Sequence, residues 1–166
     1  MSNYFEQQLQ VEEEAMPLII DWLSKAYNFS LIQDVRKDKH YQENDVDLIM
    51  QDKDGIFGTF SVEIKVRAKL YPDIIVETRS NVERNTVGNL FKSQALFLVY
   101  VFLIDHKLHP NRYVIHLPKF REWFIKNKGR YKSNFAPNPP ENPVYHTEFY
   151  PIPIFDMPQE IFLFLK

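Results

Sequence analysis

The sequence predicts an α/β fold in one domain spanning residues 1–166, and three observations support this expectation. Apolar residues recur at helical spacing near the start of the chain. Two apolar runs around a polar, glycine-bearing break at 51–55 indicate a β-hairpin, and further apolar runs alternate with polar loops after it. A hydrophobic fraction of 45% is enough for a globular core.

Composition excludes several classes of protein. The formal net charge is -2, so any nucleic-acid surface has to be local. The chain has no cysteine, which excludes disulfides and thiolate zinc sites and fits a reducing compartment such as the cytoplasm. We expect no secretion signal and no membrane span, because the longest apolar run, Ala95 to Ile104, is too short to cross a bilayer.

The N-terminal segment from Asn3 to about Ala26 is expected to be an amphipathic helix. Pro17 is expected to kink or divide it. Three consecutive glutamates, Glu12, Glu13 and Glu14, leave two interpretations open: one of them reaches toward the core, or all belong to a solvated acidic face, as glutamates usually do.

The segment from Asp45 to Arg67 is the expected hairpin. If it folds about Gly55, residues whose numbers sum to about 110 face each other, and Asp47 lies opposite Glu63. Lys65 points the same way as Glu63, because side chains alternate along a strand. Two carboxylates and an ammonium group therefore converge at the open end of the hairpin.

The rest of the chain is expected to alternate strands, loops and one further helix. Tyr145–Ile154 is expected to be an edge strand, because Pro151 and Pro153 suit a central strand poorly. The other expected elements are strands at Phe29–Val35, Asp73–Ser80, Ala95–Ile104 and Arg112–Leu117, a helix at Pro118–Lys126, and an extended loop at Asn134–Pro143.

Two basic segments each admit two interpretations. The loop from Arg36 to Asn44 contains Lys37, Lys39 and His40, which either meet phosphate or are simply solvated. The most basic window, Lys126 to Lys132, either binds an anion or places its cations at a helix end, where the dipole favours them.

The convergent carboxylates suit metal-assisted cleavage of phosphodiesters. Asp47 and Glu63 are expected to hold Mg²⁺ or Mn²⁺ together with the backbone carbonyl of Ile64 and water. Such an ion neutralises charge on the phosphate and lowers the pKa of a bound water. Lys65 is expected to orient that water or to stabilise the transition state. The simpler alternative is a solvent-facing strand with ordinary surface ion pairs.

Asp47 with Glu63-Ile64-Lys65 resembles the PD-(D/E)xK motif of the restriction-endonuclease-like nucleases, and the overall look is similar to small phage or bacterial members. Val46 stands where the motif has proline, and Leu96 where an acidic residue often follows the alanine. The resemblance implies a mixed central sheet of about four to five strands flanked by helices, and a Mg²⁺-dependent endonuclease. It implies DNA as the substrate, leaves RNA open, and suggests a homodimer by analogy.

Further site residues are expected around this motif. An additional carboxylate comes from the first helix, with Glu13 as the representative of its three glutamates. Asp45 competes with Asp47 for the metal. The remaining candidates are Glu77 as a second-metal ligand if its strand neighbours that of Glu63, Gln94 as a substrate contact or turn cap, and Arg67, Lys37, Lys39 and His40 as substrate-binding residues.

A second functional hypothesis is a catalytically inactive nuclease-like module that binds nucleic acid or protein. It predicts binding without metal-stimulated turnover. The intact set of Asp47, Glu63 and Lys65 favours the enzyme instead.

Overall fold

A computed structural model describes residues 3–138 and 144–164, and the chain forms two compact units. The first unit consists of Met1–Leu70, Gln94–His116 and Phe162–Lys166. The second consists of Tyr71–Ser93 and Leu117–Ile161. Helices and strands occur in both, so the predicted α/β class is confirmed.

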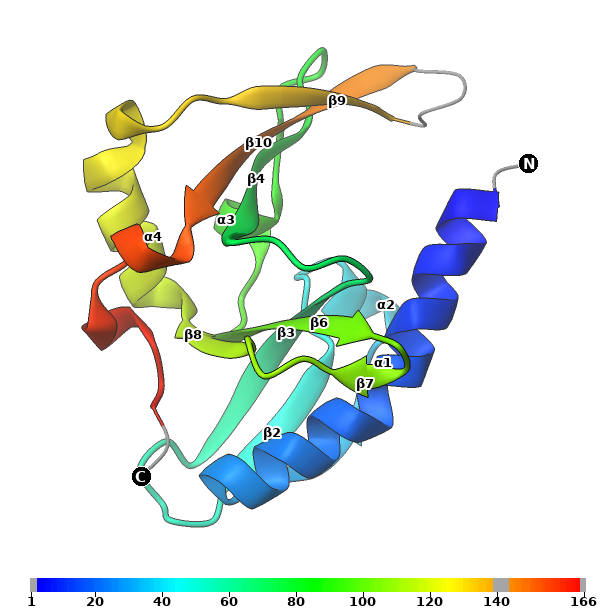
Figure 1. Cartoon of the computed structure of the whole chain (residues 1–166), viewed down its shortest axis with the longest axis vertical. Helices are drawn as coiled ribbons and strands as arrows, with labels where there is room; N and C mark the ends of the chain where they lie inside the picture. Colours follow the sequence, from blue (N-terminus) through cyan, green and yellow to red (C-terminus); the bar gives the residue numbers. More distant parts are fainter. Residues whose placement is uncertain (1–2, 139–143, 165–166) are drawn as a thin grey trace. The chain divides into compact units, whose positions relative to one another are not determined.

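The first unit contains a mixed six-stranded sheet in the order β1-β2-β3-β6-β7, with β8 also paired to β6. β2 is antiparallel to both of its neighbours, β1 and β3, whereas β3 and β6 are parallel. Figure 1 shows helix α1 (blue) alongside this sheet. The elements are α1 Asn3–Tyr27, β1 Phe29–Asp34, α2 Lys39–Gln42, β2 Leu48–Asp52, β3 Thr59–Arg67, β6 Phe97–Ile104, β7 Lys107–Leu108 and β8 Tyr113–His116.

The hairpin register is the predicted one. Leu48 pairs with Val62 and Met50 with Phe60, so the paired residue numbers sum to 110. The buried Asp52 carboxylate accepts hydrogen bonds from the backbone N–H groups of 54, 56 and 57 and so organises the turn. Gly55, with a φ of 78°, supplies the left-handed conformation that the turn needs.

The predicted N-terminal helix is confirmed, but Pro17 does not divide it. A proline removes one backbone hydrogen bond from a helix. Here the helix continues because Met16 and Ile19 are buried in the core beside it, and tertiary packing outweighs the local loss. No helix among the described residues is long and apolar enough to span a membrane.

One face of β3 forms the core of the first unit. Val62, Ile64 and Val66 are buried there in a cluster that includes residues of α1 and alternate residues of β6. Because side chains alternate, the intervening Glu63 and Lys65 point to the opposite face of the strand. The packing of the apolar face therefore fixes the direction of the two charged side chains.

The second unit contains a four-stranded antiparallel sheet in the order β5-β4-β10-β9. Its helices include α4, whose buried Phe120 and Phe124 form its inner face. The elements are β4 Asp73–Asn81, β5 Thr86–Val87, α3 Asn89–Lys92, α4 Leu117–Asn127, η1 Lys128–Arg130, β9 Asn134–Asn138, β10 Tyr145–Pro153, η2 Ile154–Asp156 and η3 Gln159–Ile161.

Two expectations about the C-terminal region were wrong. β10 is not an edge strand, because it pairs with both β4 and β9. Its prolines are tolerated because β9 pairs only with Tyr145–Phe149, so Pro151 and Pro153 have a single neighbour. The expected loop at Asn134–Pro143 begins with strand β9, and residues 139–143 lie outside the described part of the chain.

Candidate active site

Asp47 lies directly before β2, at the open end of the hairpin. Its own N–H donates to the Val62 carbonyl at 2.9 Å. The Ile64 N–H in turn donates to the Asp47 carboxylate at 2.6 Å. These two hydrogen bonds bracket Glu63, so the hairpin backbone itself holds the carboxylates of Asp47 and Glu63 near each other.

Glu63 and Lys65 form the β3 half of the site. The Lys65 ammonium lies 3.5 Å from the Glu63 carboxylate. Glu63 is only 4% exposed, which is unusual for a glutamate, whereas the Lys65 side chain is 41% exposed. Lys65 therefore connects a buried negative charge to the solvent.

The surroundings of Asp47 raise the pKa of its carboxyl group to about 6, and burial is the largest cause. The Ile64 N–H opposes this by stabilising the charged form, and so does the Lys65 ammonium. The negative charges of Glu63 and Glu12 raise the pKa further. A carboxyl group perturbed by burial and by a like charge is typical of functional sites.

The three consecutive glutamates of α1, Glu12, Glu13 and Glu14, have different neighbours. Glu12 lies close enough to Asp47 to raise its pKa by charge repulsion. Glu13 instead binds Arg36 at 3.2 Å, and Glu14 binds His106 at 2.5 Å. The helix carboxylate that acts on Asp47 is thus Glu12, and the choice of Glu13 is corrected. Helical spacing could have shown this, because Glu12 precedes the buried Met16 by one turn.

The structure gives the local setting of three other candidates. Glu77 lies on β4 in the second unit, whereas the neighbours of β3 are β2 and β6, so the condition set for its role, a strand adjacent to that of Glu63, is not met. Asp45 has a φ of 48° in the turn before β2, and strand alternation does not extend to it. Gln94 donates from its side chain and its backbone to Asn44, at 2.8 and 2.9 Å, which ties two loops together.

The candidate substrate-binding cations fall into two groups. Arg67 follows Lys65 on the same face of β3 and donates to the Tyr100 hydroxyl at 3.4 Å. Lys37, Lys39 and His40 are exposed on the segment around α2. Tyr100 was not predicted from the sequence; it is 2% exposed and faces Lys65 across the parallel β3–β6 ladder.

The donor set of this site suits Mg²⁺. Over residues 3–138 and 144–164, no group of three or more His, Cys, Asp or Glu side chains is placed to hold a metal ion. Mg²⁺ does not require such a group, because it commonly keeps several waters and uses one or two carboxylates together with substrate phosphate. Burial is the main cause of the raised pKa of Asp47, and the negative charges of Glu63 and Glu12 add to it, so a cation bound here would favour the ionised carboxylate.

Comparisons with protein-family models, with curated proteins and with solved structures found no match to this chain. The function proposed below therefore depends on the chemistry of Asp47, Glu63 and Lys65.

Proposed function

We propose that this protein is a Mg²⁺-dependent nuclease that hydrolyses phosphodiester bonds in DNA. The observation that carries the proposal is that the hydrogen bonds from Asp47 to Val62 and from Ile64 to Asp47 bracket Glu63, with the Lys65 ammonium 3.5 Å from the Glu63 carboxylate. Glu63 is buried and Asp47 is partly buried, and carboxylates withdrawn from water are costly unless a cation compensates them. We therefore expect the carboxylates of Asp47 and Glu63 to bind a cation.

Asp47 and Glu63 would hold the metal, with the Ile64 carbonyl as the predicted backbone ligand. When bound, Mg²⁺ neutralises charge on the phosphate and lowers the pKa of a coordinated water. Asp47 must be ionised to bind it, so its raised pKa makes metal binding stronger as the pH rises through about 6. Glu12 adds negative charge to the same region.

Lys65 supplies a positive charge that does not depend on the metal. Its ammonium reaches solvent while remaining 3.5 Å from Glu63, so it can bind a phosphate oxygen or orient the attacking water. Arg67, two residues farther along the same face, would bind a neighbouring phosphate.

The order of elements in the first unit supports the resemblance to the restriction-endonuclease-like fold. A glutamate-bearing helix precedes three antiparallel strands, and a later strand lies parallel to the third. Asp47 lies directly before the second strand, and Glu63 and Lys65 lie on the third.

The test is cleavage of plasmid and single-stranded DNA with Mg²⁺, Mn²⁺ or EDTA. Asp47→Asn, Glu63→Gln and Lys65→Ala are expected to reduce the rate at least about 100-fold, since each removes a group that acts on the reacting phosphate. The two isosteric changes preserve packing around the buried carboxylates. Circular dichroism verifies that each variant is folded.

The matched controls are Glu122→Gln and Lys53→Ala, which change exposed side chains of the same types away from the motif. Full activity in Glu63→Gln would refute the proposal. Metal-independent binding of DNA with no turnover in the wild type would favour the inactive binding module instead.

A further inference from the structure

The basic window Lys126 to Lys132 lies mainly beyond the end of α4, which stops at Asn127. Lys126 pairs with Glu122 on the helix at 2.7 Å. Lys128 instead lies over the Tyr150 ring, 5.5 Å from its centroid, and Arg130 lies 5.8 Å from the centroid of Tyr131. The helix dipole therefore accounts for Lys126 at most, and the following cations rest on aromatic faces.

The positive charges after α4 are not neutralised by ion pairs. In the part of the chain that the structure describes, Lys128, Arg130 and Lys132 form no ion pair with a carboxylate. Lys128 helps to lower the pKa of Glu148, but that buried carboxylate is already bound by Arg79 at 2.9 Å. Arg130 donates one hydrogen bond to the Asn127 side chain at 3.2 Å, and a cation stacked on an aromatic ring keeps its remaining N–H donors available for an anion.

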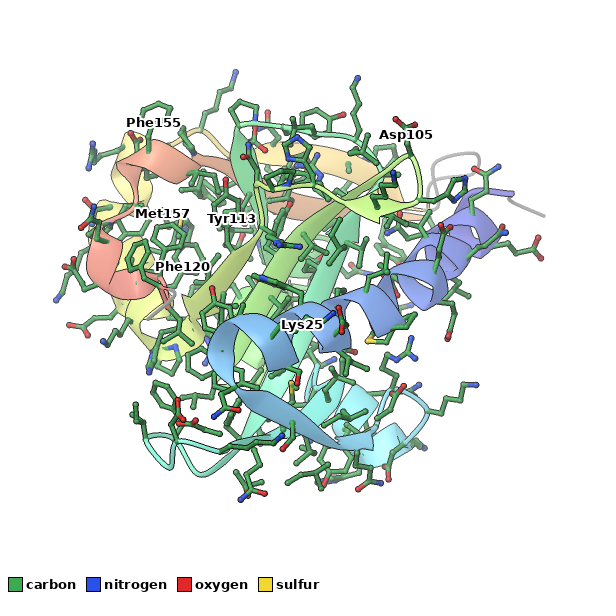
Figure 2. The ribbon with its side chains drawn as sticks, turned by 60° about the horizontal axis from the view of Figure 1, so that its bottom comes forward. Lys25, Asp105, Tyr113, Phe120, Phe155 and Met157 are labelled. Atoms are coloured by element: carbon green, nitrogen blue, oxygen red, sulfur yellow. The ribbon has the colours of Figure 1, made fainter. Side chains whose placement is uncertain are left out.

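An exposed aromatic ring lies on η2, a segment that is hydrogen-bonded to the end of η1. The Tyr131 hydroxyl donates to the Asp156 carboxylate at 3.0 Å, which brings η2 next to the end of η1. Phe155, in η2, is 82% exposed, although the nearby Met157 is buried. In Figure 2, Phe155 lies at the outer margin of the second unit's ribbon, with Met157 and Phe120 farther inside.

We propose that Lys128, Arg130, Lys132 and Phe155 form a binding surface for single-stranded nucleic acid, called here the η1–η2 surface. Its cations bind backbone phosphates, and the Phe155 ring stacks on a base. The choice of nucleic acid as partner rests on the proposed nuclease function. The surface itself belongs to the second unit and contains none of the catalytic residues.

Exposed aromatic rings and cations together favour a single strand over a duplex. A base can stack on a protein ring only when it is not already stacked within a double helix. Such stacking tolerates any base sequence, while the cations follow the backbone. The η1–η2 surface is thus expected to bind single strands with little sequence preference and with a strong dependence on salt.

The experiment measures binding of a fluorescein-labelled 20-nucleotide oligo-dT to the full chain by fluorescence anisotropy in EDTA, so that no cleavage intervenes. Phe155→Ala is expected to weaken binding about 10-fold, the loss of one stacked base. Phe155→Tyr should bind as the wild type, whereas Phe155→Leu should bind as Phe155→Ala. Since Phe155 is 82% exposed, these variants are expected to fold normally.

Arg130→Ala and Lys128→Ala test the phosphate contacts. Each is expected to weaken binding and to lower the slope of log K against log salt by about 0.7, the value for one contact to a single strand. The matched controls are Arg84→Ala, an exposed arginine in the β4–β5 turn, and Phe164→Ala, a 58% exposed phenylalanine of the first unit. Both controls should bind as the wild type.

Several results would contradict the proposal that the η1–η2 surface binds single-stranded nucleic acid. The proposal is contradicted if Phe155→Ala and Arg130→Ala bind the oligonucleotide as tightly as their controls do, or if a 20-base-pair duplex binds as tightly as the single strand. Phe155-dependent binding to phosphatidylserine vesicles in place of the oligonucleotide would also exclude it. Failure of the nuclease proposal is separate, because it shows as the absence of Asp47-dependent cleavage.

Discussion

The charged form of Asp47 is destabilised by its own fold. Burial and the neighbouring Glu63 raise the pKa of this carboxyl group to about 6 from an ordinary value of 3.8. The folded chain therefore keeps a proton that the unfolded chain loses between about pH 4 and pH 6, so stability falls as the pH rises through that window. The difference corresponds to about 2 to 3 kcal/mol.

Asp47→Asn is accordingly expected to stabilise the protein while it abolishes cleavage. At pH 8 in EDTA, the free energy of unfolding should rise by about 2 kcal/mol, because the amide is neutral and its oxygen can still accept from the Ile64 N–H. The gain should disappear by pH 4, where the wild-type carboxyl group is protonated. Urea denaturation at pH 4, 6 and 8 measures both. A variant less stable than the wild type at pH 8 would contradict this account.

Individual site residues differed in how far the sequence could predict them. Asp47 and Glu63 were predictable because a hairpin joined by a short turn has one natural register. Helical spacing could have identified Glu12, but Glu13 was chosen without applying that spacing. Tyr100 could not be predicted, because its position opposite Lys65 depends on a parallel pairing between strands that the whole first segment of the second unit separates.

At the scale of elements, Gly88 joins β5 to α3 where no side chain fits. A Cβ at this position would lie 2.7 Å from the Glu77 carbonyl oxygen, and backbone atoms of β4 cannot move aside cheaply. Gly88→Ala is expected to destabilise the protein by about 1 to 3 kcal/mol.

The matched control for this change is Gly129→Ala, because nothing lies within 4 Å of a Cβ built there. Its stability should equal that of the wild type or slightly exceed it. Thermal unfolding of both variants provides the comparison. Equal midpoints for the two would show that β4 accommodates the methyl group.

The elements that the sequence predicted well are those with a local pattern: α1, the β2–β3 hairpin, and the continuous apolar strand β6. β10 was misassigned as an edge strand because its prolines were judged without its neighbours. Propensity describes a residue, whereas strand position depends on which distant segments pair with it. The same reason explains why the sequence left open whether the strand of Glu77 lies beside β3.

For the whole molecule, a bound metal ion should appear as added stability. Mg²⁺ at about 100 times its Kd is expected to raise the thermal midpoint by about 5 to 10 °C at pH 7.5. The shift should be much smaller at pH 5, where Asp47 is largely protonated, and EDTA should reverse it. Differential scanning calorimetry measures the midpoint.

Glu63→Gln and Asp47→Asn should lose this shift, and Glu122→Gln should keep it. An equal shift in all of these proteins would place the ion elsewhere on the chain.

The single-domain organisation of residues 1–166 and the restriction-endonuclease-like fold remain predictions. The α/β class and the mixed sheet are established.

The segments of the two units alternate along the sequence. The chain passes between them after Leu70, after Ser93, after His116 and after Ile161. Each unit is thus assembled from segments that other residues separate in sequence. A protease that cut the chain once, after Leu70 for example, would free neither unit, because the fragment carrying the second would still carry β6 of the first.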